Sequence, residues 1–209
     1  MTDLRLTRRS AIATGLAGTA ILAAGPLAAQ EAEARAVEEL VLGSPDAPVT
    51  VVEYASLTCP HCARFHTDVF GQIKTNYIET GKVRFVVRDV YFDRYGLWAA
   101  MVARCGGAER YFGITDQLYR KQAEWSRHEN PNDAIAAIFA IGRQAGLTDE
   151  QMTECTQDQA WAEALVAEFQ KNMEADGVEG TPTFFINGRK EANMPYAEFA
   201  AKLDEAIGS

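Results

Sequence analysis

The sequence is poor in cysteine and in basic residues. The first shortage excludes one class of protein, and the second argues against two kinds of partner. It has four cysteines in 209 residues, too few for a small domain held together by many disulfides. Its 20 lysines and arginines are outnumbered by 29 acidic residues, which gives a net charge of −9. So acidic a chain is a poor match for nucleic acid or for an anionic membrane surface. We therefore expect neither as its main partner.

The composition is that of a soluble globular protein, with 47% hydrophobic and 23% charged residues. A chain of 209 residues can form one large domain or two small ones with a sizeable core. Past the first 29 residues it has no internal repeat and no low-complexity tract.

Residues 1–29 have the pattern of an export signal. A basic start that includes the pair Arg8 and Arg9 precedes a run without charge, from Ala11 to Ala29. The run is about long enough to anchor the chain in a membrane, but it is weakly apolar, so we expect cleavage near residue 29. The arginine pair also resembles a twin-arginine signal, which leaves Sec and twin-arginine export both open. Either route crosses a bacterial inner membrane and predicts a periplasmic protein.

The region after the signal predicts a strand, a helix and a strand. Residues 49–54 are β-branched and mostly apolar, which is typical of a buried central strand. Apolar residues then recur at helical spacing from Pro60 until Gly81, which ends the helix. His66 falls on this helix and is expected on its surface. Residues 83–87 form the second strand, so the two strands are expected to be parallel.

The rest of the chain is mainly helical, with one return of β character. A strand is expected at 183–186, followed by a tight turn at Asn187 and Gly188 and a last helix over 196–207. Residues 30–48 predict a short helix and then a loop. Between the two β regions we expect helices over 94–105, 108–122, 132–145, 148–156 and 159–175. The core of this helical region is expected to contain Trp98, Trp125 and Trp161.

This order predicts an α/β domain that is interrupted by an all-helical insertion. The α/β domain is expected to comprise residues 30–92 and 177–209, and the insertion residues 93–176.

Cys59 and Cys62 form a C-x-x-C pair at the start of a helix. Two cysteines at this spacing can close a small disulfide ring or share a metal. The free N–H groups and the dipole of the helix start stabilise an anion, and the thiolate is the reactive form of cysteine. We expect His61 to stabilise the Cys59 thiolate as well, and we interpret the pair as a redox-active dithiol. Cys59 should face solvent, and Cys62 should be shielded by the helix in which it lies.

A C-x-x-C pair can also belong to a haem attachment site, a zinc site or a purely structural disulfide ring. A haem attachment site needs a histidine directly after the second cysteine, where Ala63 stands. A zinc site needs a second pair of ligands, whereas Cys105 and Cys155 are isolated. A purely structural disulfide ring remains open, but would be an unusual use of a strand-to-helix turn.

Two further positions are candidates for the same site. Pro182 follows Thr181 directly before a predicted strand, where either a cis proline or an ordinary trans proline can stand. Glu53 lies in an otherwise apolar strand, six residues before Cys59. Its side chain could be buried and carry protons for a thiol, or it could reach solvent from the strand end.

Together these residues resemble the DsbA-type thiol:disulfide oxidoreductases. The resemblance rests on Cys59-Pro60-His61-Cys62 and on the later run from Gly177 to Gly188. It implies a thioredoxin-like fold with a helical insertion, a cis Pro182 packed against the dithiol, and Glu53 as a buried acid beneath it. It also implies oxidation of reduced, newly exported proteins, no cofactor, and reoxidation by a DsbB-type membrane partner linked to quinone.

The sequence departs from the best-known oxidases of this type in two ways. Thr181 stands before the proline where a branched aliphatic residue is usual, which keeps a disulfide isomerase or reductase open as an alternative. Cys105 and Cys155 could form a second, structural disulfide in the insertion, or could be two buried free thiols. A metal or copper carrier that uses Cys59 and Cys62 is the alternative from another class, although no metal is expected. We expect a monomer.

Overall fold

The structure is a computed structural model, and it describes residues 36–208. The predicted export signal at 1–29 lies outside the described residues. No helix within 36–208 is long and apolar enough to cross a membrane.

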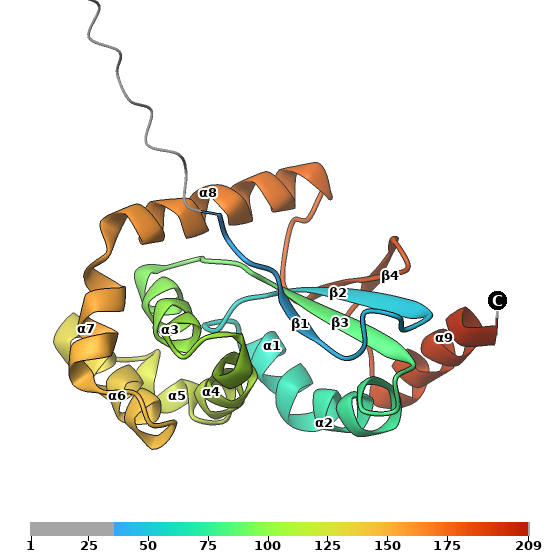
Figure 1. Ribbon diagram of the computed structural model, residues 1–209, viewed down its shortest axis with the longest axis horizontal. Helices are drawn as coiled ribbons and strands as arrows, with labels where there is room; N and C mark the ends of the chain where they lie inside the picture. The colour runs from blue at the N-terminus through green and yellow to red at the C-terminus, as the bar shows by residue number, and fades with distance from the viewer. Residues whose placement is uncertain (1–35, 209) are drawn as a thin grey trace, which may run out of the picture. The chain divides into compact units, whose positions relative to one another are not determined.

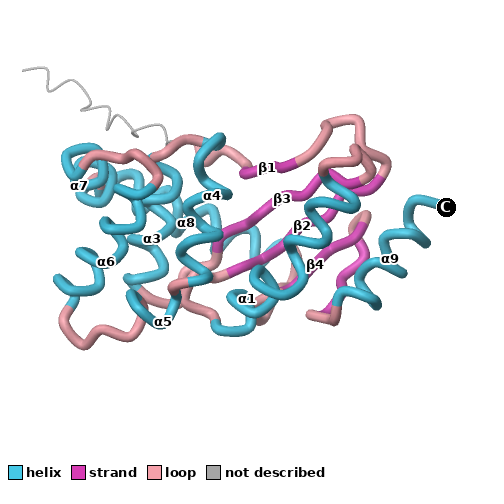
Figure 2. The backbone as a smooth tube through the Cα atoms, turned by 90° about the horizontal axis from the view of Figure 1, so that it is seen from below, coloured by secondary structure: helices cyan, strands magenta, loops and turns pink. Residues whose placement is uncertain are grey.

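Five strands form one mixed sheet in the order β1-β3-β2-β4-β5 (Figure 2). β2 is parallel to β3 and antiparallel to β4, while β1 and β5 pair antiparallel at the two edges. The parallel pair confirms the predicted strand, helix and strand unit. The strands are β1 Leu40–Leu42, β2 Val49–Ala55, β3 Val83–Asp89, β4 Thr183–Ile186 and β5 Arg189–Ala192.

β2 holds the centre of the sheet because its residues suit a strand with neighbours on both sides. Val49 and Val51 have no exposed surface, and Val52 stands in register between Val86 of β3 and Phe185 of β4. β-branched side chains pack well on such a surface. The last residues of β2 are therefore held firmly where the C-x-x-C turn begins.

The helix that follows is continuous but not uniform. It consists of α1 Pro60–Phe65, the π-helical segment η1 His66–Phe70, α2 Gly71–Ile73 and the π-helical segment η2 Lys74–Ile78. Gly81 adopts a positive φ of 76° just beyond its end, as the predicted stop requires. Such π turns are uncommon and are frequent at functional sites. Here they change which side chains face inward.

Six helices separate β3 from β4. They agree with the predicted helices, except that the helix expected over 108–122 ends at Arg120 and a short helix follows. Lys121 has φ −104° and ψ 17° and breaks the helical path between the two. The six are α3 Arg94–Cys105, α4 Ala108–Arg120, α5 Gln122–Trp125, α6 Pro131–Gln144, α7 Asp149–Gln157 and α8 Gln159–Ala175.

Helices cover both faces of the sheet. Figure 1 shows α8 above the strands, with α1, α2 and the last helix, α9 Tyr196–Gly208, on the other side. Tyr54 and Val178 form a small apolar cluster against Phe169 of α8. The main core lies on the other face of the sheet and extends into the inserted helices. Phe85 of β3 and Leu118 of α4 belong to the same buried cluster.

Two short edge strands were not predicted. β1 lies where the end of a short helix was expected, and its Leu40–Leu42 pairs with Phe85–Val87. Three residues are too few to show the alternation that marks a strand. The loop expected after it is present at residues 43–48. β5 is mostly exposed and charged, so it carries no apolar pattern, and its position depends on the turn at Asn187 and Gly188.

The tryptophans are only partly where the sequence suggested. Trp125 is fully buried, as expected of a core residue. Trp98 and Trp161 are half-buried, so they lie at the border of the helical region rather than inside it.

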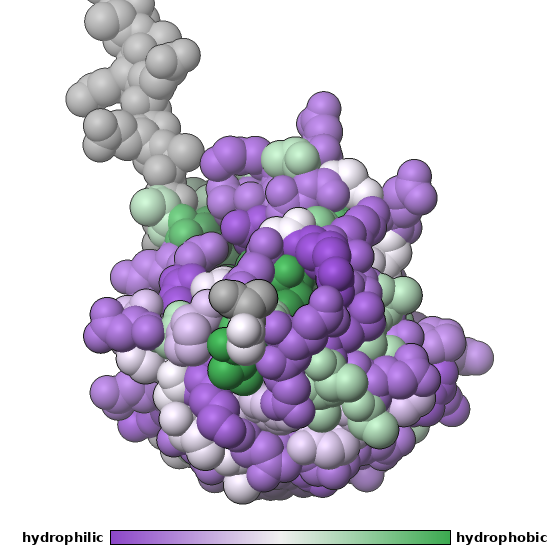
Figure 3. Space-filling view, turned by 90° about the vertical axis from the view of Figure 1, so that its right-hand side faces the viewer, coloured by the Kyte–Doolittle hydropathy of each residue, from purple (hydrophilic) through white to green (hydrophobic). Residues whose placement is uncertain are grey.

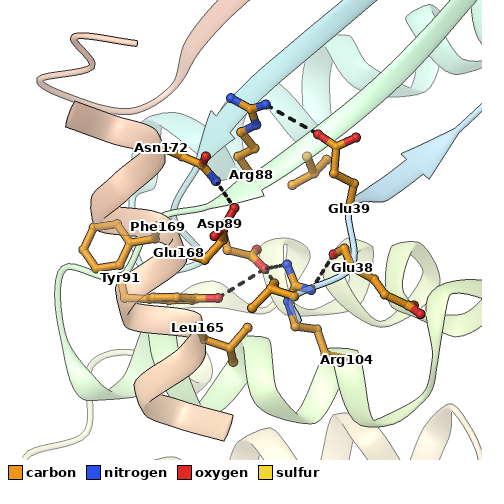
Figure 4. A pocket seen from close by; sticks show the side chains of 12 residues that line it. Glu38, Glu39, Arg88, Asp89, Tyr91, Arg104, Leu165, Glu168, Phe169 and Asn172 are labelled. Carbon is orange, nitrogen blue, oxygen red and sulfur yellow. Dashed lines mark hydrogen bonds and ion pairs between the residues drawn. The ribbon is translucent and has the colours of Figure 1, made fainter. Parts of the chain in front are cut away.

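A buried ion pair ties β3 to the inserted helices. Arg104 of α3 lies 2.9 Å from Asp89, and both side chains are less than one-tenth exposed. The hydroxyl of Tyr111 donates to the other oxygen of Asp89 at 2.5 Å. Figure 4 shows Asp89 and Arg104 beside α8, where both line a small pocket of about 60 Å³. Removing one partner of such a pair leaves a buried charge without compensation, so the pair fixes the junction.

A disulfide joins Cys105 at the end of α3 to Cys155 of α7, the pairing that the sequence made possible. It closes a loop with a sequence separation of 50 residues, and it connects the first and penultimate helices of the insertion.

Loss of this disulfide should lower the free energy of unfolding. Closing a loop of this length restricts the unfolded chain by about 4 kcal/mol in the chain-entropy account. We therefore expect the double variant Cys105→Ser, Cys155→Ser to lose about 3–4 kcal/mol in urea unfolding, with the Cys59–Cys62 pair kept reduced in both proteins. A loss below about 1 kcal/mol would contradict the expectation.

Candidate active site

The C-x-x-C pair begins directly after β2, at the turn into α1. Cys59 is the N-cap residue, in an extended conformation, and Pro60 takes the first helical position, where its missing N–H costs nothing. The N–H of Cys59 donates to the Ser56 carbonyl at 3.1 Å, and its own carbonyl accepts from Ala63 at 3.1 Å. The turn thus places the first sulfur at the start of the helix.

The two thiols are free and differ in exposure. Cys59 is 8% exposed and Cys62 is fully buried. The order is the expected one, although Cys59 is more enclosed than a residue facing solvent. An incoming thiol therefore has access to Cys59 alone.

The two sulfurs have opposite proton affinities. The pKa of Cys59 is lowered to about 5, first by a hydrogen bond from the Cys62 thiol and then, against the effect of burial, by the backbone N–H groups of Cys62 and His61. The pKa of Cys62 is strongly raised, mainly by burial, and further by its bond to Cys59 and by the charge of Glu53. Near neutral pH the reduced pair thus holds one thiolate and one thiol.

His61 acts differently from the expectation. Its imidazole is exposed, and Nδ1 accepts a hydrogen bond from the Arg64 guanidinium at 2.7 Å. What His61 contributes to the low pKa of Cys59 comes through its backbone N–H. After the Cys62 thiol, the backbone N–H groups of the helix start, rather than the imidazole, therefore stabilise the thiolate.

Thr181 and Pro182 form the opposite wall of the site. Their peptide bond is cis, and the Cys59 sulfur lies 3.4 Å from the Thr181 carbonyl oxygen, to which it donates when it is protonated. The Thr181 hydroxyl is buried and has no hydrogen-bond partner among the described residues. Residues separated by 122 positions thus meet at one sulfur.

Glu53 is fully buried, which decides between its two predicted placements. Both carboxylate oxygens contact Nε2 of His66, at 3.0 and 3.1 Å. The expectation that His66 lies on the helix surface is wrong, since the residue is 8% exposed. The π-helical turn brings its ring inward, where Tyr119 stacks on it with the ring centres 4.2 Å apart.

Gln122 is a residue of the site that the sequence did not indicate. From α5, its side-chain amide donates to the carbonyls of Leu57 at 2.7 Å and Cys59 at 3.0 Å. It thereby fastens the active-site turn to the helical insertion. A single glutamine in a polar run gives no pattern from which such a distant contact could be inferred.

The large apolar side chains around the C-x-x-C turn form no exposed docking surface, since Tyr54, Leu57 and Phe65 are exposed by 3% or less. Phe92 is instead the large hydrophobic side chain that is exposed within 36–208, at 57%. Over the same residues no group of three or more His, Cys, Asp or Glu side chains is arranged to hold a metal ion.

The acidity of Cys59 can be measured by titrating the reduced protein. We expect thiolate absorbance or alkylation rate to rise with a midpoint near pH 5, because the pKa of Cys59 is lowered to about 5, and we expect Cys59→Ser to lose this transition. The folded thiolate also favours the folded state. Its contribution is fully present above the pKa of an unfolded cysteine, about 8.5, and is lost as the pH falls through the folded value. A midpoint near 8.5 would contradict the hydrogen-bonded thiolate.

Sequence comparisons place these features in a known group. A family profile described as thioredoxin matches residues 35–205. A candidate protein-disulfide oxidoreductase of Rickettsia bellii is 34% identical over 170 residues, which is 81% of this chain and 64% of that protein. The match therefore spans less than two thirds of that relative's length. Disulfide bond formation protein D of Bacillus subtilis is 26% identical, over 80% of this chain and 76% of its own.

Comparison with solved structures agrees. The crystal structure of α-DsbA1 from Wolbachia pipientis matches with a TM-score of 0.76 and 29% identity, covering 82% of this chain and 92% of that one. The chain belongs to the thioredoxin-like family, and its relatives there are DsbA-type disulfide oxidoreductases.

Proposed function

We propose that this protein is a periplasmic thiol:disulfide oxidoreductase that donates the Cys59–Cys62 disulfide to newly exported proteins. The two thiols support this proposal because they differ in acidity: the pKa of Cys59 is lowered to about 5, and that of Cys62 is raised. A stabilised thiolate favours the reduced pair and makes the disulfide a strong oxidant.

The reaction follows from this contrast. A substrate thiolate attacks the Cys59 sulfur, the Cys59–Cys62 bond breaks, and a mixed disulfide forms. Cys62 leaves with the electron pair and takes up a proton, as its raised pKa requires. A second substrate thiolate then attacks the substrate sulfur of the mixed disulfide and releases Cys59. Because a thiol of low pKa is a good leaving group, this release needs no proton.

Thr181 and Pro182 supply the binding surface in this proposal. An extended substrate would pair with the backbone beside the cis proline, as a form of strand addition. In the disulfide form the Cys59 sulfur carries no proton, so the Thr181 carbonyl beside it is free to accept a hydrogen bond from the substrate backbone. Pro60 and His61 shape the turn. Glu53 gives a proton to the Cys62 sulfur and takes it back.

In this proposal the protein acts in the periplasm, on exported substrates and with a membrane-bound reoxidant. The basic and then uncharged run at residues 1–29 supports export, and the Cys105–Cys155 disulfide suits an oxidising compartment. The substrates would be reduced or unfolded exported proteins. Reoxidation would fall to a DsbB-type membrane protein linked to quinone.

The test uses the two single-cysteine variants as a matched pair. The wild-type oxidised protein should oxidise a reduced dithiol peptide, and Cys59→Ser should abolish this because no reachable sulfur remains. Cys62→Ser should instead accumulate a mixed disulfide through Cys59 when supplied with an activated substrate disulfide. Mass spectrometry of the adduct and of the peptide measures both.

Three outcomes would redirect the proposal. Peptide oxidation that survives in Cys59→Ser would overturn it. Efficient reshuffling of a scrambled disulfide protein, with little net oxidation, would favour an isomerase. Stoichiometric metal in the purified protein, lost in Cys62→Ser, would favour a metal carrier.

A further inference from the structure

The proposed reaction places a proton requirement at a buried atom. In the reduced pair Cys59 is a thiolate and Cys62 a thiol, so reducing the disulfide consumes one proton at the Cys62 sulfur and reoxidation releases one. Cys62 has no exposed surface. The proton must therefore pass through protein groups, and this argument rests on the proposed function.

Glu53 is the first group on such a path. Glu53 is hydrogen-bonded to His66, which stands four positions after Cys62 on the same continuous helix, and all three side chains are buried. Residues four apart lie on one face of a helix, so the carboxylate and the Cys62 thiol share one part of the core, and the charge of Glu53 raises the pKa of that thiol. Glu53 is itself without exposed surface, so it cannot exchange protons with water directly. Its hydrogen-bond partner through both carboxylate oxygens is His66.

His66 connects this buried pair to the outside. Its side chain is 7% exposed and lines an open groove of about 600 Å³ between the η1–α2 region and α4. None of Cys59, Cys62 and Pro182 lines that groove. Nε2 is committed to Glu53, so Nδ1 is the ring nitrogen left to exchange a proton with the groove.

The ring is also held in a fixed plane. Tyr119 of α4 stacks on it with an interplanar angle of 15° and a centroid distance of 4.2 Å, and Phe70 lies 4.8 Å away on its own helix. A fixed plane keeps Nε2 aimed at the carboxylate. Imidazole can also take up a proton at one ring nitrogen and release one from the other, which suits a proton carrier.

We propose that His66 relays protons between water in this groove and Glu53, and that Glu53 exchanges them with the Cys62 sulfur. When the disulfide is reduced, a proton from groove water binds the imidazole, the Nε2 proton passes to Glu53, and Glu53 delivers one to Cys62. Reoxidation runs the same transfers in reverse. His66 touches neither the substrate nor the sulfur, so it is a positioning residue that acts through Glu53.

Other charged groups face the groove and would set its local field. Lys74 and Glu79 come from the end of the long helix, while Glu109, Asp116 and Arg120 come from α4. Arg120 is paired with Asp116 at 2.8 Å. The mixture leaves the groove accessible to water and to small buffer molecules of either charge.

The experiment compares His66→Gln and His66→Ala with the wild type in the full-length protein. Glutamine can still donate to Glu53 but cannot carry a proton, whereas alanine leaves space for an added base. The measured quantity is the single-turnover rate at which a reduced peptide reduces the Cys59–Cys62 disulfide, followed against pH and buffer concentration. His128→Gln, which changes a histidine in a loop outside this path, is the control.

We expect His66→Gln to slow the reduction about 100-fold and to make its rate depend on buffer concentration. Added imidazole should restore the rate in His66→Ala, and His128→Gln should behave as the wild type. A wild-type rate in His66→Gln would overturn the relay. So would a slow His66→Ala that imidazole and buffer do not accelerate, because that result indicates a structural role. A wild-type protein that does not oxidise the peptide would instead show that the proposed function has failed.

Discussion

The structure depends on the different environments of two sulfur atoms that lie within one helical turn of each other. Cys59 stands at the N-cap of α1, where the Cys62 thiol and backbone N–H groups stabilise its thiolate. Cys62 lies inside the core near the negative charge of Glu53, where only the thiol is stable. Because each environment favours a different protonation state, the reduced pair is held as one thiolate and one thiol. The proposed oxidising activity follows from this inequality.

The fold keeps that inequality in place from three directions. β2 carries Glu53 and ends at the turn that leads into α1. The loop with the cis peptide bond before Pro182, which is distant in sequence, forms the opposite wall of the site. Gln122 fastens the same turn to the helical insertion. The insertion also contributes Tyr119, which stacks on the histidine that holds Glu53. The inserted helices are therefore part of the active-site architecture, in addition to extending the core.

Local patterns in the sequence were sufficient for most of the fold. Strand residues at 49–54, the capping residues of the long helices and the C-x-x-C spacing each act within a few positions, and the structure follows them. Contacts between distant segments were not accessible in this way. Gln122 and the edge strand β1 carry no pattern of their own, and His66 was expected on the surface because uniform helical spacing does not foresee a π turn. The imidazole of His61 was similarly given a role that its backbone N–H performs.

The reduction potential of the Cys59–Cys62 couple tests the central claim most directly. It can be measured by equilibrating the protein with glutathione buffers and quantifying the disulfide. A thiolate stabilised as strongly as that of Cys59 predicts a potential above about −200 mV, well into the oxidising range of dithiol proteins. A potential near that of thioredoxin, about −270 mV, would contradict the account.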